Sequence, residues 1–353
     1  MRYPFAMECG QYRTSYEQDM ALHPTRLAVW RGWVLVGLLY VAPLLFSAYK
    51  VSLLVQVVIF AIAAMGLNVL TGFTGQISVG HGAFMGVGAF TAGYVTMKAG
   101  LPYWIALPLA GLTSAAVGAL FGLPSARLKG LYLAIASMAA QVILEFLFVR
   151  MEWFTGGVHS MSVSRPTFFG KSLESEYGYY WMALTVALGL GVFARNLLRT
   201  RAGRAFLAVR DRDLAAEVMG VELWRTKVTA FALSAFFTGI AGALWAPYVM
   251  IINPEQFNFH LSIELLAMVI IGGIGSVNGS AYGAIFMTLL PILVRNMTQP
   301  LSEVWPAVAD QLLLLKDIAF GAAIILFLVF ESEGLEKLWR NVKDYFRLWP
   351  FSY

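Results

Sequence analysis

A glycine-rich segment, residues 67–94, holds polar side chains that could contact a polar solute. The candidates are Asn68, Thr71, Gln76, Ser78, His81 and the small Gly82. Each glycine lowers helix stability by about 1 kcal/mol relative to alanine, yet membrane proteins tolerate glycine where helices pack tightly or where backbone lines an enclosed cavity. The segment therefore predicts either one wall of a translocation path or a packing helix with a polar turn. His81 taken singly is interpreted as a hydrogen-bonded structural residue.

A second polar segment, residues 199–227, is strongly basic. Its candidate contact residues are Asp213, Leu214, Ala215, Ala216, Glu217 and Gly220. The aspartate can cap a short helix that begins at the leucine, and the glycine can end it. A short helix with small side chains on its surface is suited to docking in a groove of a partner protein. The alternative is a basic loop beside anionic lipid, which does not explain the Ala-Ala-x-x-x-Gly spacing.

Residue types that serve catalysis or metal binding are few and scattered. Cys9 is the single cysteine, which excludes an internal disulfide framework, and the four histidines show no metal-ligand spacing. No Walker A motif occurs, because neither glycine-rich stretch ends in Gly-Lys-Ser/Thr. Acidic residues within or near apolar stretches are Glu145, Glu264 and Asp317, the last adjacent to Lys316. We interpret the two glutamates as paired or interfacial groups, and we expect no enzyme activity, cofactor or metal in this chain.

Lipid is expected to cover much of the protein. Of its 353 residues, 59% are hydrophobic and 13% are charged, whereas soluble domains carry about 25% charged residues. Helices of about 20 apolar residues cross a bilayer, and candidate stretches are 29–49, 51–70, 78–97, 102–122, 131–149, 179–197, 228–250, 262–277, 279–297 and 308–330. We predict an all-α, polytopic transmembrane helical bundle of about ten spans (8–10). Glycines interrupt the region 262–297, which could instead form a broken or re-entrant helix.

Small residues at four-residue spacing predict close helix packing within this bundle. The spaced glycines are Gly82/Gly86, Gly118/Gly122 and Gly275/Gly279/Gly283. They indicate a compact bundle and do not name a function.

The distribution of Lys and Arg sets the expected orientation. Most basic residues lie in the N-terminal segment, the loop after residue 122, the second polar segment and the C-terminal tail. Placing these regions in the cytoplasm puts both termini inside. The expected organisation is a cytoplasmic segment 1–28, a transmembrane domain 29–330 with an outer loop 150–178 and a cytoplasmic loop 198–227, and a cytoplasmic tail 331–353.

Several stretches resemble one family of transport proteins. LAAEVMG, residues 214–220, resembles the permease signature of ABC importers, in which Glu-Ala-Ala is followed after three residues by Gly; Leu214 stands where that signature has Glu. LNVLTGFTGQISVGHGAFMGVGAFTAGY (67–94), FTGG (Phe154–Gly157) and VIIGGIGSVNGSAYGAIF (Val269–Phe286) resemble LivM-type subunits. Over most of residues 50–330 the chain is similar to the LivH/LivM family of branched-chain amino-acid permeases.

The resemblance implies an importer of leucine, isoleucine and valine in the bacterial inner membrane. It implies as partners a homologous LivH-like permease subunit, two cytoplasmic ABC ATPase subunits that bind ATP and Mg²⁺, and an extracytoplasmic amino-acid-binding protein. Residues 213–220 would form the coupling helix that receives the motion of the ATPase. Membrane lipid surrounds such a subunit, and nucleic acid is not an expected partner.

Three alternatives remain open. Importers of urea or short-chain amides use similar subunits, and they would need a small polar pocket in place of an apolar one. An ion-coupled secondary transporter would need carboxylates near the middle of the membrane and no loop for docking an ATPase. A membrane enzyme would need a set of catalytic residues on one side of the membrane, and the sequence places none there.

Overall fold

The computed structural model describes residues 15, 26–157, 160–168, 171–173, 175–304, 318, 321–322, 325–326, 329 and 334–348. Within these residues the chain is a bundle of helices with two short two-stranded sheets. Lys316 and Asp317, most of the predicted span 308–330 and most of the predicted segment 1–28 lie outside the described residues.

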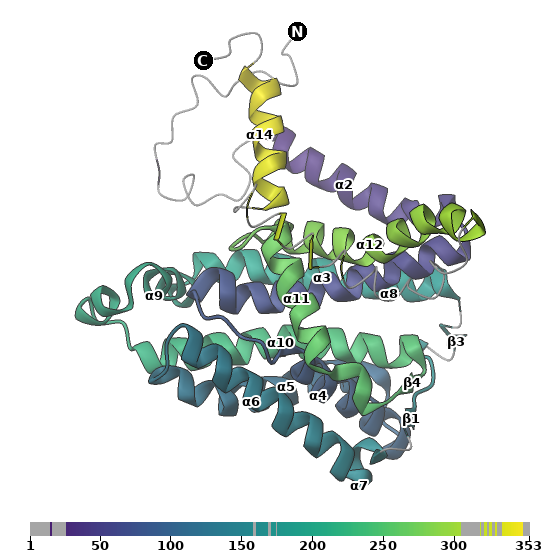
Figure 1. Cartoon of the computed structure of the whole chain (residues 1–353), viewed down its shortest axis with the longest axis horizontal. Helices are drawn as coiled ribbons and strands as arrows, with labels where there is room; N and C mark the ends of the chain where they lie inside the picture. Colours follow the sequence, from purple (N-terminus) through teal and green to yellow (C-terminus); the bar gives the residue numbers. More distant parts are fainter. Residues whose placement is uncertain are drawn as a thin grey trace.

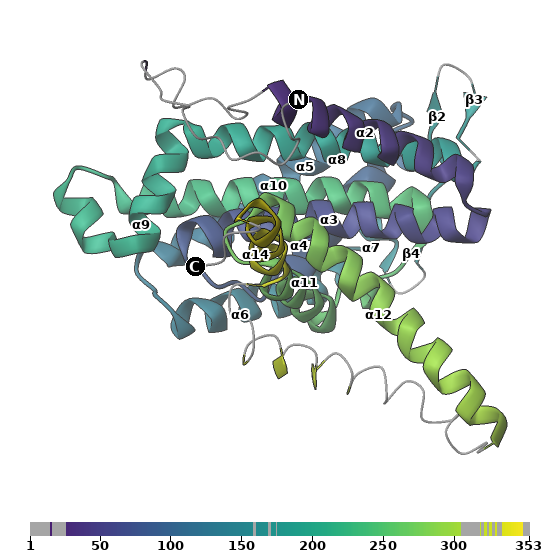
Figure 2. The ribbon, with the colours of Figure 1, turned by 90° about the horizontal axis from the view of Figure 1, so that it is seen from above.

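Helix α10 (Leu223–Val249) lies at the centre of the bundle. It packs against α3 (Ala48–Thr74), α4 (His81–Gly93) and α5 (Tyr103–Gly122). Helices α3 and α10 run alongside each other along the long axis (Figure 1, Figure 2). Every residue of α4 and residues 61–74 of α3 are buried. Helices that are apolar all round are expected in such a central position.

The outer layer consists of helices that keep large apolar side chains exposed. They are α2 (Arg26–Leu45), α6 (Leu131–Arg150), α8 (Glu176–Arg199) and α12 (Val277–Val304). Among the described residues, six helices (α3, α5, α6, α8, α10 and α12) are long and apolar enough to cross a bilayer. The predicted all-α polytopic class is therefore confirmed, and the count of ten spans stays a prediction.

Two of the predicted spans are interrupted. The stretch 78–97 becomes helical only at His81, and the 13 residues of α4 rise about 20 Å before the π-helical turn Tyr94–Lys98 extends them. The stretch 262–277 forms α11 (Phe259–Gly272), whose 14 residues rise about 21 Å, less than the roughly 30 Å of a hydrocarbon core. A turn with two glycines at positive φ then leads into α12.

Glycines allow the helices to approach closely. A Cβ atom built at Gly122 of α5 would lie 2.7 Å from the Cβ of Phe231 in α10. A Cβ atom built at Gly279 of α12 would lie 2.7 Å from the carbonyl oxygen of Gly272 in α11. Both distances are shorter than van der Waals contact, so a larger residue would push the helices apart. The compact packing predicted from the spaced glycines is confirmed.

The two ends of the bundle differ. At the strand end (right in Figure 1) lie α7 (Glu152–Thr155), the antiparallel pair β1 (Met161–Ser162) and β4 (Ile251–Ile252), and the antiparallel pair β2 (Thr167–Phe168) and β3 (Lys171–Ser172). A 3-10 turn, Pro254–Phe257, leads from β4 into α11. At the opposite, α9 end, helix α9 (Arg201–Val218) projects beyond the bundle, and the 3-10 turn Leu123–Ala126 follows α5. The last described helix is α14 (Leu335–Leu348).

Candidate functional site

His81 begins α4 and is fully buried. Its Nε2 lies 2.6 Å from Ser234 Oγ of α10, and its Nδ1 lies 3.0 Å from Ser78 Oγ. Because the Ser234 hydroxyl donates to the carbonyl oxygen of Gly66 in α3 (2.6 Å), the Ser234 oxygen accepts from His81 Nε2–H. Burial disfavours the charged imidazolium, so the ring is neutral and Nδ1 accepts from the Ser78 hydroxyl. His81 thus joins α4 to α10 and to the extended residues before it, as expected of a structural residue.

Side chains from two other helices hold the buried start of α4. The first N–H groups of a helix have no partner within it, so they need other partners when buried. Gly82 N donates to Ser262 Oγ of α11 (2.8 Å), and Ala83 N donates to Gln141 Oε1 of α6 (2.8 Å). The same Gln141 accepts from the Ser262 hydroxyl (2.9 Å) and donates to the carbonyl oxygen of Phe257 (2.7 Å). Helices α6 and α11 therefore fix where α4 can begin.

Asn68 of α3 binds the glycine turn between α11 and α12. Its Nδ2 donates to the carbonyl oxygen of Ser276 (2.6 Å) and to Ser280 Oγ (2.8 Å), and its Oδ1 accepts from Gly275 N (2.8 Å). A Cβ atom at Gly72, one turn further along α3, would overlap the backbone of Gly275. The turn therefore packs directly against this face of α3.

Two further predicted path residues lie nearer the α9 end. Thr71 Oγ1 and Gln76 Oε1 are buried without a hydrogen-bond partner among the described residues. Gln76 lines a cavity of about 590 Å³ whose walls also include Gly75, Lys129 and Arg210. The other predicted path residues contact helices of this same chain. That all six line a translocation path stays a prediction.

Helix α9 consists of two helical pieces divided at Arg212. Arg212 has φ −156° and ψ 103°, outside the helical region, so the residues after it form a separate short helix. Asp213 Oδ1 accepts from Leu214 N (2.9 Å), and Asp213 Oδ2 lies 2.6 Å from Lys129 Nζ and 3.6 Å from Lys227 Nζ. The hydrogen bond from Lys129, helped by the Lys227 charge, holds the pKa of the Asp213 carboxyl below its ordinary value of 3.8. The carboxylate thus ties the start of the short helix to two other parts of the chain.

The short helix ends at Gly220, as the sequence predicts. Gly220 N donates to the carbonyl oxygen of Glu217 (2.9 Å), and Val221 N donates to that of Ala216 (2.9 Å). This pair of hydrogen bonds is a Schellman ending, which places one residue in the left-handed region. Gly220 takes that place with φ +89°. Glycine is needed here because it readily adopts this positive φ. A side chain would not clash, because nothing lies within 4 Å of a Cβ built at this position.

The short helix presents an apolar surface at the tip of a charged loop. Leu214, Val218 and Met219 are 68%, 87% and 85% exposed, whereas Ala216 is 5% exposed and faces the bundle. Ala215 and Glu217 are also exposed. Large apolar side chains gathered on a polar surface mark a protein contact site. We call Leu214, Ala215, Val218 and Met219 the docking face.

Arg210 connects α9 to the interior segments. A Cβ atom at Gly75, directly after α3, would lie 3.5 Å from Arg210 Cγ, and one at Gly275 would lie 2.8 Å from Arg210 Nη1. Arg210 therefore lies beside Gly75, which begins the non-helical segment that precedes α4, and beside Gly275 in the turn that precedes α12.

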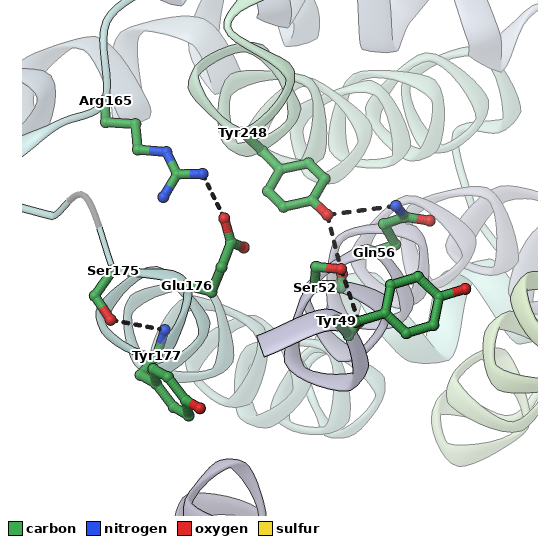
Figure 3. A network of polar contacts seen from close by, with 8 residues as sticks. All are labelled: Tyr49, Ser52, Gln56, Arg165, Ser175, Glu176, Tyr177 and Tyr248. Atoms are coloured by element: carbon green, nitrogen blue, oxygen red, sulfur yellow. Dashed lines mark hydrogen bonds and ion pairs between the residues drawn. The ribbon is translucent and has the colours of Figure 1, made fainter. Parts of the chain in front are cut away.

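Two separate groups of polar contacts lie at the strand end (Figure 3): one joins α10 to α3, and the other joins the loop between β1 and β2 to α8. Tyr248 of α10 donates to the carbonyl oxygen of Ser52 (3.0 Å) and accepts from Gln56 Nε2 (3.3 Å), both in α3. Arg165, from the loop between β1 and β2, forms an ion pair of 2.5 Å with Glu176 at the start of α8. These contacts, together with the β1–β4 pair, hold the strand-end loops against the bundle.

The described carboxylates of the apolar helices have partners. Glu145 accepts from Gln141 Nε2 (2.8 Å), and Glu264 Oε1 lies 3.3 Å from His260 Nε2 one turn earlier in α11. Both of these partners lie in the glutamate's own helix, so the interpretation that each glutamate pairs with another helix or reaches an interface stays a prediction. Asp317, the remaining candidate for ion coupling, lies outside the described residues.

Comparisons with known proteins point to one family of permeases. A family model described as "Branched-chain amino acid transport system / permease component" matches residues 49–328. The "High-affinity branched-chain amino acid transport system permease protein LivM" of Salmonella typhimurium is 32% identical over 329 residues, which cover 85% of this chain and 74% of that protein. The Escherichia coli protein of the same name is 32% identical over the same shares. The "Probable branched-chain amino acid transport permease protein LivM" of Methanocaldococcus jannaschii is 27% identical over 65% of this chain and 67% of its own length.

No solved structure matches the chain. The six long apolar helices and the relatives identify a multi-pass protein of the bacterial inner membrane. The family model covers well over half of the chain, and relatives above 30% identity cover more than two thirds of it. The chain therefore belongs to the family of branched-chain amino acid transport system permease components.

Proposed function

We propose that this chain is one permease subunit of an ABC importer for leucine, isoleucine and valine. The observation that carries the proposal is the docking face, an exposed apolar surface on a short helix at the tip of α9. The two most similar relatives described above are high-affinity permeases for branched-chain amino acids, which supports this substrate.

In this proposal the α9 end is cytoplasmic and residues 213–220 form the coupling helix. Two ATPase subunits bind ATP and Mg²⁺ on that side, and one of them receives the docking face in a groove. Both termini, residues 1–28 and 331–353, lie on the same side, and the transmembrane domain 29–330 crosses the membrane about ten times. The outer loop 150–178 faces an extracytoplasmic amino-acid-binding protein, and a LivH-like subunit completes the path.

The contacts of Arg210 suggest how ATPase motion reaches the path. A push on the docking face moves α9, and Arg210 passes the displacement to Gly75 and Gly275. The residues after Gly75 lead directly to His81, whose hydrogen bonds fix the start of α4. Of the predicted path residues, Gln76, Ser78, His81 and Gly82 follow Gly75 in the chain. Asn68, in α3, binds the turn that contains Gly275, and Thr71 also lies in α3.

The docking face is tested with two substitutions of the same type. Leu214→Asp, in the short helix, is expected to reduce leucine uptake by about tenfold or more, because a buried unpaired charge in an interface costs several kcal/mol. The ATPase should also be lost from the purified membrane complex. Leu207→Asp, in the first piece of α9 and 37% exposed, is the control and should retain both.

Loss of the ATPase in both variants would contradict the assignment of docking to the short helix. Full uptake by Leu214→Asp at normal membrane levels would overturn the coupling role itself. The substrate is tested separately, by competition of leucine, valine, urea and acetamide for uptake through the complete transporter. Competition by urea or acetamide without competition by leucine would transfer the proposal to the amide importers.

A further inference from the structure

Helix α14 has one apolar face, and it lies beyond the residues matched by the family model. Leu335, Leu338, Trp339, Val342 and Tyr345 recur at the three- and four-residue spacing that places side chains on one side of a helix. The last four of these are 40–62% exposed. A helix with an exposed tryptophan, tyrosine and aliphatic side chains along one face needs an apolar environment for that face.

The opposite side of α14 is charged, with basic residues outnumbering the acidic Glu336 and Asp344. Lys337, Arg340 and Lys343 lie 80–200° around the helix from Leu335, at about 100° per residue. Lys343 borders the apolar face, and Arg340 lies nearly opposite its middle. Apolar residues that include Trp and Tyr, combined with Lys and Arg on the other side, are typical of helices that lie in the membrane interface.

The direction of α14 fits that environment. Figure 1 shows α14 running across the direction of α3 and α10, and Figure 2 shows the same helix nearly end-on. Since α3 and α10 are helices long enough to cross the bilayer, α14 lies close to the plane of the membrane. In both views it lies at the level where α2 begins, and the first turns of α2 carry Arg26 and Arg31, as is typical of a helix end near the membrane interface.

The start of α14 is attached to the bundle at the same level. Gly334 has φ +79°, and a Cβ atom built there would lie 2.6 Å from Gly273 N in the turn between α11 and α12. Leu335 packs against the core. The helix is thus anchored at its first residues, and the remainder of its apolar face is exposed.

We propose that α14 lies flat in the membrane interface, with its apolar face among the acyl chains and its basic residues on acidic phospholipid headgroups. Each Lys or Arg near an anionic membrane surface contributes about 1 kcal/mol of attraction. The assignment to the cytoplasmic leaflet rests on the orientation given under the proposed function, whereas the interfacial position does not.

The test uses the complete transporter in vesicles of phosphatidylethanolamine and phosphatidylglycerol. With Cys9 replaced by Ser, single cysteines at Trp339 and Val342 report the apolar face, and one at Arg340 is the matched control. Each carries an environment-sensitive fluorophore. Labels at 339 and 342 should be quenched by lipids with a nitroxide near the headgroup, and iodide in water should quench them about threefold less than the label at 340.

Two results would overturn the proposal. Equal iodide quenching at 339, 342 and 340 would mean that the face is in water. Protection of 339 and 342 from both quenchers would mean that a protein covers them. Equal protection of the labels at 339 and 342 from iodide in phosphatidylcholine vesicles would show that acidic headgroups do not hold the helix in place. A label at Arg201→Cys marks the α9 side of the membrane. If iodide reaches the labels at 340 and 201 from opposite sides of the membrane, the assignment of α14 to the cytoplasmic leaflet is wrong, whereas its interfacial position stands.

Discussion

Ser234 connects His81 to α3 through a single hydroxyl group. Its oxygen accepts from His81 Nε2–H, and its proton goes to the carbonyl oxygen of Gly66. Both Ser234 and His81 are fully buried. Removal of the hydroxyl would leave a buried N–H without an acceptor, which costs about 1–3 kcal/mol. A small polar group thus stabilises the contact of three helices, α3, α4 and α10.

We expect Ser234→Ala to lower the stability of the purified transporter by about 1–3 kcal/mol, measured as a lower thermal unfolding temperature. Thr229→Ala is the control, since its exposed hydroxyl bonds only to the carbonyl oxygen of Arg225 within α10. That variant should change stability by less than about 0.5 kcal/mol. An unchanged unfolding temperature for Ser234→Ala would show that the hydroxyl does not contribute.

Sequence reasoning found His81 and its partner Ser78, but not its partner Ser234. The density of polar residues and glycines in 67–94 indicated this segment, whereas Ser234, Gln141 and Ser262 each stand alone in apolar helices. A glutamine inside the apolar stretch 131–149 was the available signal, because burying an amide without partners is costly. The partner it meets depends on helices that are distant in sequence, which a local pattern does not contain.

At the scale of helices, the approach of α10 to α5 depends on Gly239. A Cβ atom there would overlap the side chain of Ser114 and lie 2.9 Å from the carbonyl oxygen of Ala110, both in α5. On the other side, a Cβ atom at Gly88 of α4 would overlap Gly239 itself. Helices α5 and α4 therefore leave no room for a side chain at Gly239.

Gly239→Ala should therefore destabilise the protein by about 1–3 kcal/mol through overpacking, although alanine is the better helix former. Gly189→Ala in α8 is the matched control, because nothing lies within 4 Å of a Cβ at that position. The control should be neutral or stabilising by up to about 1 kcal/mol. Thermal unfolding of both variants checks this, and equal effects of the two would refute the packing explanation.

Hydrophobic length predicted most of the helices, and it was less informative where a helix is enclosed by protein. The ends of α6 and α8 fall within a few residues of the predicted stretches 131–149 and 179–197. The start of α4 was predicted too early, because residues 78–80 belong to a non-helical segment, 75–80, in which Gln76, Ser78 and Gly80 are buried. In this segment the backbone N–H of Val79 donates to the Ser137 hydroxyl of α6. Ser137 is distant in the sequence, so no local pattern reveals this contact.

At the scale of the whole molecule, Arg210 joins the docking face to the interior. It lies beside Gly75 and Gly275, in two short segments that precede α4 and α12, and α4 begins at a fully buried residue. The cavity of about 590 Å³ is lined by Arg210 together with Gly75 and Gln76, so it leaves space beside the segment that precedes α4. Coupling between distant sites requires such a contiguous contact and an element with more than one arrangement.

Arg210→Ala should consequently separate ATP hydrolysis from transport. The docking face is unchanged in this variant, so the ATPase should remain bound and active, whereas the leucine transported per ATP hydrolysed should fall by about fivefold, within the usual range of coupling energies. Arg201→Ala removes an exposed arginine at the start of the same helix and should leave this ratio unchanged. Both quantities are measured together in proteoliposomes. A normal ratio in Arg210→Ala would show that motion reaches α4 by another route. Loss of the ATPase from this variant would show that Arg210 belongs to the docking site, because its side chain would then be needed for binding the ATPase and not for transmitting its motion.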